Sequence, residues 1–327
     1  GGGGWGRGGG GERSRATIMS AVGSLAVFDP LLITGGYGAE TFLYVALILN
    51  AFLLLDSRHQ VLAGCLLGLA VVCRGDAAVA AAVYLLVWAL RHRRLPVQAG
   101  LACCAVAGTW ASCATLYYRT PWPQTLAVKR MQAAVWDGRF LDGIPFYAAR
   151  FLGQSRWIAV MAPLAVIGLL RVLRRRLVVP GALALWAGSY LAAFAVLNVP
   201  YVYIWYYSVV SPLVVILAGL GLVGLARQKR PWGAMAAAAA WGVTLVSFAQ
   251  CGAAFGRWLP YPRHPVYVEA AMWIKTDSSQ DATVAAFEVG AVGYVSQRHI
   301  IDLWGLVTPG VARHTLAQGD GTWALRR

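Results

Sequence analysis

The sequence predicts an all-α polytopic membrane protein of about nine transmembrane helices, followed by a small C-terminal extracytoplasmic α/β segment. Three observations lead to this prediction. Hydrophobic residues make up 59% of the 327 residues, and charged residues make up 13%. Several apolar windows approach 20 residues, the length that crosses about 30 Å of hydrocarbon. Basic residues gather in short clusters between these windows.

Nine apolar runs are the candidate spans, and the third and fourth are short. They cover residues 17–33, 39–55, 60–73, 76–90, 96–116, 157–170, 177–197, 204–226 and 232–254. The predicted domains are a low-complexity, disordered N-terminus at 1–15, a transmembrane domain at 16–254, and an extracytoplasmic C-terminal segment at 255–327. The transmembrane domain includes an extracytoplasmic loop at 117–156.

The basic clusters set the predicted orientation. If all nine runs cross the membrane, four clusters fall on one side, which the positive-inside rule makes cytoplasmic. These clusters are Arg58–His59, Arg91–Arg94, Arg171–Arg176 and Arg227–Arg230. The same arrangement explains the net charge of +15 as a set of topology signals, so nucleic acid is not an expected partner. The expected location is an inner or plasma membrane, in contact with membrane lipids.

The C-terminal segment is predicted to be a small α/β unit. Helical spacing over Pro265–Thr276 repeats the apolar residues Val266, Ala270 and Trp273. Two β-rich stretches follow, Thr283–Phe287 and His299–Leu303, and the glycine-rich residues between them predict a turn.

Three ionisable residues lie at the ends of apolar runs on the predicted outer side. Glu40 follows the glycine-rich stretch GGYGA and is either a helix cap or a ligand for a polar substrate. Arg74 and Asp76 lie between two short runs, where charged groups are costly unless paired or functional. They form either a mutual ion pair or a site in which Arg74 binds phosphate.

Two further groups are candidates for substrate binding. Lys129 and Arg130 lie in the predicted outer loop, where basic residues depart from the positive-inside trend and suit anion binding. Trp205, Tyr206 and Tyr207 begin the eighth run and form either an aromatic belt or a platform for a sugar or lipid.

The order of these motifs over about residues 20–310 resembles the multi-spanning GT-C glycosyltransferases. The likeness is greatest to bacterial relatives of dolichyl-phosphate-mannose protein mannosyltransferases and of aminoarabinose lipid A transferases. GGYGAET resembles their GxET turn, VVCRGD resembles their TRPE or TRPD hairpin with Gly75 in place of proline, and IWYYSVVSP resembles their WYYxPxxP span.

The resemblance implies transfer of a sugar from a polyprenyl-phosphate donor to an extracytoplasmic glycan, lipid or protein. Glu40 and Asp76 are then the candidate bases, and Arg74, Lys129 and Arg130 are candidates to stabilise the leaving phosphate. No metal ligands are identified, although some members of these families use a divalent metal. The first outer loop of such enzymes carries a catalytic aspartate that this sequence lacks, so we expect an N-terminal truncation or loss of the base. The alternatives are a transporter or flippase, and a non-catalytic degenerate membrane protein.

Overall fold

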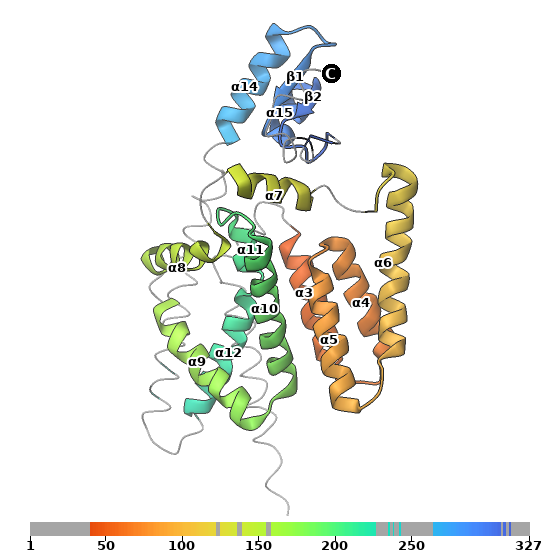
Figure 1. The fold of residues 1–327 in the computed structure, drawn as a ribbon. Helices are drawn as coiled ribbons and strands as arrows, with labels where there is room; N and C mark the ends of the chain where they lie inside the picture. The colour runs from red at the N-terminus through yellow and green to blue at the C-terminus, as the bar shows by residue number, and fades with distance from the viewer. Residues whose placement is uncertain are drawn as a thin grey trace, which may run out of the picture. The chain divides into compact units, whose positions relative to one another are not determined.

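The computed structural model describes residues 40–121, 125–135, 139–154, 158–226, 264–308 and 310–311, together with positions 235, 238, 242 and 314. These residues are mostly helical, with one two-stranded sheet near the C-terminus (Figure 1). This confirms the predicted helical fold with a small C-terminal α/β piece. The predicted N-terminus at 1–15 and the run 17–33 lie outside the described residues, as does nearly all of 232–254.

The chain divides into two compact units. The first unit comprises residues 1–112, 144–193 and 203–257, and the second comprises 113–143, 194–202 and 258–327. Each unit is described by itself.

The first unit is built from helices, and all of them except α8 follow apolar runs of the sequence. These are α3 (Thr41–Leu53), α4 (Gln60–Cys73), α5 (Ala77–His92), α6 (Val97–Tyr118), α8 (Gly143–Gln154), α9 (Ile158–Arg175), α10 (Val178–Leu197), α11 (Ile204–Ser208) and α12 (Ser211–Ala226). The last residues of α6 and α10, and the first residue of α8, belong to the second unit. Among the residues that the structure describes, three stretches are long and apolar enough to cross a membrane: Val97–Tyr118, Val178–Leu197 and Ile204–Leu225. The helices α3, α4 and α5 are apolar but shorter.

Glycines allow two pairs of these helices to approach closely. A Cβ atom on Gly64 or Gly68 of α4 would collide with the backbone or side chains of α6, and Gly68 would meet Val106 Cβ at 2.7 Å. In the same way, a Cβ on Gly168 of α9 would collide with the carbonyl of Leu217 on α12. Such contacts between small residues are typical of helix association in membranes, where packing replaces the hydrophobic effect.

Buried aromatic side chains hold α3, α5 and α10 together. Phe52 on α3 contacts Tyr84 on α5 edge-to-face, with ring centroids 5.7 Å apart. Phe52 also lies 6.5 Å from Trp186 on α10, which in turn packs on Tyr190. All four side chains are fully buried. This packing brings α10 against the hairpin of short helices.

The second unit contains the predicted C-terminal α/β piece. Helix α14 (His264–Asp277) packs on α15 (Val289–Ser296), and strand β1 (Thr283–Ala286) pairs in parallel with β2 (His299–Asp302). The predicted helix and both strands are therefore confirmed. The predicted glycine-rich turn is wrong, because those residues form α15, the crossover that joins two parallel strands.

The predicted outer loop at 117–156 also contains regular structure. Its described residues form the end of α6, α7 (Thr125–Val135), the short helix η1 (Phe140–Asp142) and α8. In α7, Val128 and Met131 are buried at a three-residue spacing and pack against Trp304. An amphipathic helix of 11 residues is too short to stand out as an apolar run, which explains why the sequence indicated only a loop.

Candidate functional site

The candidate site lies in the first unit, at the turn between α4 and α5. Arg74 ends α4 in an extended backbone conformation, and Asp76 precedes the first residue of α5. Gly75 between them is exposed. The turn is so short that both charged side chains lie on the same side, against the start of α3.

Asp76 binds the Arg74 guanidinium with both carboxylate oxygens. Arg74 Nη2 lies 2.7 Å from Asp76 Oδ2, and Arg74 Nε donates to Oδ1 at 3.3 Å. The Tyr190 hydroxyl donates to Oδ2 at 3.5 Å from α10. The ion pair that was one interpretation of this turn is therefore present, and both side chains are largely buried, with 9% and 16% of their surfaces exposed.

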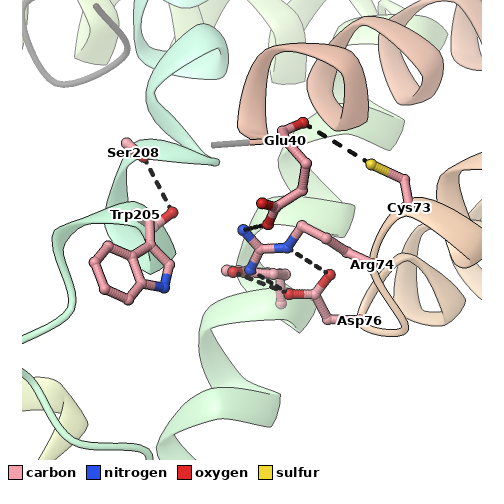
Figure 2. A network of polar contacts seen from close by, with 7 residues as sticks. Glu40, Cys73, Arg74, Asp76, Trp205 and Ser208 are labelled. Carbon is pink, nitrogen blue, oxygen red and sulfur yellow. Dashed lines mark hydrogen bonds and ion pairs between the residues drawn. The ribbon is translucent and has the colours of Figure 1, made fainter. Parts of the chain in front are cut away.

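Glu40 reaches the same guanidinium from the other side. Its Oε1 lies 3.4 Å from Arg74 Nη1, and its side chain makes no capping hydrogen bond to α3. Figure 2 shows Arg74 between the two carboxylates. The Glu40 side chain is 49% exposed, so one face of this carboxylate stays open while the other contacts the cation. Glu40 therefore occupies the N-cap position of α3, as one interpretation of the sequence expected, but its carboxylate contacts Arg74 and makes no capping hydrogen bond.

Two tyrosine rings complete the surroundings of Arg74. The guanidinium carbon lies 5.1 Å from the ring centroid of Tyr44 on α3 and 5.3 Å from that of Tyr206 on α11. Both tyrosines are buried. An arginine at this distance from an aromatic face is attracted by the ring quadrupole, and more strongly where water is excluded. We call Glu40, Arg74, Asp76 and the tyrosines 44, 190 and 206 the Arg74 cluster.

The three predicted aromatic residues do not act alike. Of these, Tyr206 contacts Arg74, whereas Trp205 and Tyr207 are partly exposed. Tyr207 packs on Tyr147 of α8, with ring centroids 5.0 Å apart. The ring of Trp205 packs at a tilt against that of Tyr203, with ring centroids 4.7 Å apart, and its indole points away from Arg74 in Figure 2.

Lys129 belongs to the second unit, on α7. Its ammonium donates to Gln132 Oε1 at 3.0 Å, and 8% of the residue is exposed. Burial lowers the pKa of this amine from 10.5 to about 7. The side chain of Arg130 lies outside the described residues.

Asp302 is a structural residue of the second unit. Its carboxylate is fully buried and accepts hydrogen bonds from the backbone N–H groups of Trp304 at 2.8 Å and Val307 at 2.9 Å. These bonds hold the segment after β2. Within the described residues, no three His, Cys, Asp or Glu side chains gather as metal ligands would.

Sequence reasoning missed Tyr44 and Tyr190. A signal existed for Tyr44, because it follows Glu40 by four residues and so lies on the same face of α3. No local signal existed for Tyr190, which lies 114 residues after its partner Asp76.

Comparison with known proteins gives one match. Residues 260–326 match a family described as "Domain of unknown function (DUF8728)". This region includes α14, β1, α15 and β2. No curated protein and no solved structure matches the chain.

Proposed function

We propose that the protein is an integral membrane glycosyltransferase that moves a sugar from a polyprenyl-phosphate donor to an extracytoplasmic acceptor. The observation that carries the proposal is the Arg74 cluster. A half-exposed carboxylate, Glu40, rests on a buried guanidinium that a second carboxylate, Asp76, holds in place. The cluster lies at the ends of apolar helices, where a lipid-linked substrate can bring its headgroup.

The geometry favours Glu40 over Asp76 as the base. Both oxygens of Asp76 bind Arg74 and the carboxylate is largely buried, so an acceptor has little access to it. Glu40 has one contact to Arg74 and an open face. In the proposed step, Glu40 takes the proton from an acceptor hydroxyl or amine. The acceptor atom then bonds to the anomeric carbon, and the bond from that carbon to the phosphate oxygen breaks as polyprenyl phosphate leaves.

Arg74 has two tasks in the proposed step. As the structure stands, Arg74 fixes the position of Glu40. Its Nη1 faces Glu40 at 3.4 Å without a hydrogen bond from that nitrogen within the described residues, so a phosphate oxygen could take the place of the carboxylate. The leaving phosphate would then gain a charge-assisted bond as its charge develops.

The membrane setting of the proposal has two supports. In the described part of the chain, three helices are long and apolar enough to cross a membrane. In addition, α4 and α6 run in the same direction, because Gly64 faces Ala99 and Gly68 faces Cys103. That direction is the one expected if both helices run from the cytoplasmic side to the outer side. Nine spans with the loop and the C-terminal segment outside the cytoplasm remain part of the proposal.

The test uses the full chain in lipid nanodiscs. Radiolabelled polyprenyl-phosphate mannose and polyprenyl-phosphate aminoarabinose serve as donors, and membrane extracts supply the acceptors. We expect Glu40→Gln to lower transfer at least about 100-fold, the usual contribution of a general base. Because Glu40 is half exposed, its loss should change stability by about 1 kcal/mol or less.

A matched control comes from the opposite end of α5. Asp56 is also a half-exposed carboxylate paired with an arginine, Arg91, but it lies away from the Arg74 cluster. Asp56→Asn should leave transfer within about twofold of the wild-type rate. If Glu40→Gln is as active as the wild type, Glu40 is not the base. If the wild type transfers sugar from neither donor, the proposal that the protein is a glycosyltransferase is wrong.

A second candidate function rests on the pairing of Arg74 with two carboxylates. Two carboxyl groups on one buried arginine also describe a structural ion-pair network in a non-catalytic protein, or an ionisable site in a transporter. With the protein placed in sealed lipid vesicles instead, movement of a labelled donor across the bilayer without transfer of its sugar would favour the transporter or flippase.

A further inference from the structure

Two of the basic clusters of the sequence come together in the first unit. Asp56 lies in the loop between α3 and α4, and Arg91 lies in the last turn of α5. Arg91 Nη2 donates to Asp56 Oδ2 at 3.1 Å, and Arg91 Nε donates to the other carboxylate oxygen. Arg58 follows Asp56 by two residues, and Arg93 follows Arg91 by two residues. The ion pair therefore joins the two basic stretches into one surface, on which all four residues are exposed.

Buried hydrogen bonds hold the loop between α3 and α4 against α5. Gln60, the first residue of α4, is 7% exposed, and its amide donates to the carbonyl of Ser57 at 2.9 Å. The hydroxyl of Tyr84 on α5 donates to Gln60 Oε1 at 3.2 Å. A topology signal requires only that its arginines stay on one side of a membrane. That requirement does not explain why two basic stretches are held together.

Three arginines on this surface keep their positive charge uncompensated. Within the described residues, no carboxylate pairs with Arg58, Arg93 or Arg94, whereas Arg91 is paired with Asp56. Two residues of extended chain span at most about 7 Å, so the Cα atoms of Arg58 and Arg93 lie within about that distance of the ion pair. The long arginine side chains can therefore converge on one phosphate, which guanidinium groups bind with paired hydrogen bonds.

Exposed leucines flank these arginines. Leu90, in the last turns of α5, is 64% exposed, and Leu95, which directly follows Arg94, is 79% exposed. Cations beside apolar side chains match the two parts of a phospholipid, an anionic headgroup and an acyl chain. A soluble polyanion would be recognised by the arginines alone and would leave the leucines in water.

We propose that this surface binds an anionic phospholipid, with Arg58, Arg93 and Arg94 on the headgroup phosphate and Leu90 and Leu95 against an acyl chain. We call these five residues the Arg58 surface. Basic clusters next to the ends of membrane helices attract anionic lipids, and the excess positive charge disfavours a headgroup that carries its own cation. None of these residues belongs to the Arg74 cluster, so the inference goes beyond the proposed function and does not depend on sugar transfer.

The test measures the binding of dioleoyl-phosphatidylglycerol and of dioleoyl-phosphatidylcholine to the full chain in detergent, by native mass spectrometry. We expect the wild type to bind phosphatidylglycerol at least about tenfold more tightly. The triple variant Arg58→Gln/Arg93→Gln/Arg94→Gln should lower the affinity for phosphatidylglycerol by about 10- to 100-fold, because one arginine near a lipid surface contributes about a fivefold factor. Its affinity for phosphatidylcholine should change little.

A charge-matched control removes three cations from the second unit. Arg119, Arg139 and Lys275 are all exposed. The variant Arg119→Gln/Arg139→Gln/Lys275→Gln should bind phosphatidylglycerol within about twofold of the wild type, because the Arg58 surface loses none of its own groups. If the first triple variant does not fold, Arg94→Gln alone takes its place, with an expected loss of about fivefold.

Three results would overturn the inference. Equal affinities of the wild type for the two lipids would mean that the headgroup charge is not recognised. Equal losses of affinity in the Arg58-surface variant and in the control would assign lipid binding to the net charge of the protein. Displacement of phosphatidylglycerol by an equal concentration of glycerol 3-phosphate would assign the surface to a soluble phosphate compound.

Discussion

The two units of the protein each bury a cation, and they treat it differently. In the first unit, Arg74 is held by the carboxylates of Asp76 and Glu40 and by two tyrosine rings. In the second unit, Lys129 donates to the neutral amide oxygen of Gln132. Burial disfavours the charged form of both groups, but carboxylates can compensate for it and an amide does so much less.

The difference separates a fixed charge from a variable one. A guanidinium stays protonated in proteins, so Arg74 is a permanent positive centre on which two carboxylates are arranged. The amine of Lys129, with a pKa of about 7, changes its charge near neutral pH. The Arg74 cluster is therefore suited to electrostatic positioning, whereas Lys129 couples the second unit to pH.

The largest expected effect comes from removing the carboxylate that holds Arg74. Asp76→Asn leaves a buried guanidinium without its bidentate partner, and breaking a buried ion pair in this way typically costs about 3–5 kcal/mol. We expect a marked fall in the thermal unfolding temperature of the protein in nanodiscs. An unfolding temperature within about 1 °C of wild type would show that the pair contributes little.

A double variant guards against a general failure of folding. Arg74→Met combined with Asp76→Leu removes both charges and keeps the volume apolar, so it should recover most of the lost stability. If the double variant is as unstable as Asp76→Asn, the loss comes from packing and not from an uncompensated charge.

The second prediction concerns Lys129 and pH. The folded-state pKa of about 7 is below the unfolded value of 10.5, so between these pH values the unfolded chain binds more protons than the folded protein. Stability should therefore rise as pH increases from about 7 to about 10.5, and it should be insensitive to this group below about pH 6. The expected gain is of the order of 2–4 kcal/mol, allowing for relaxation around the amine.

Lys129→Met isolates this contribution, because methionine keeps the length of the side chain and removes the charge. The unfolding temperature is measured from pH 6 to pH 10 for both proteins, and the difference between them should shrink as pH rises. A constant difference across this range would mean that the Lys129 pKa is not lowered.

Much of the helical fold could be predicted from the sequence, because the ends of the apolar runs are marked by charged residues. The run 60–73, for example, has the same bounds as α4. The same markers identified Glu40, Arg74 and Asp76, since ionisable groups at such ends are costly unless paired or functional. The prediction that all nine apolar runs cross the membrane stays a prediction.

The sequence could not show which of these residues meet, because that depends on contacts between distant segments. Tyr190 joins Asp76 through the packing of α10, and Tyr206 reaches Arg74 from α11. The glycine-rich residues 289–296 show a different limit. Their glycines indicated a turn, but a helix is needed to connect two parallel strands, and this demand of the fold overrides the local propensity.

The smallest expected effect tests whether the tyrosine rings add to the ion pairs of Arg74. Tyr206→Phe keeps the ring over the guanidinium and should leave stability within about 0.5 kcal/mol of wild type, whereas Tyr206→Leu removes the quadrupole and should cost about 0.5–2 kcal/mol more. Chemical denaturation in mixed micelles measures both. The extra loss of stability caused by Tyr206→Leu should vanish in a protein that also carries Arg74→Met, because no cation then faces the ring. A penalty that is the same in both backgrounds would assign the role of Tyr206 to packing, and the carboxylates alone would then distinguish Arg74 from Lys129.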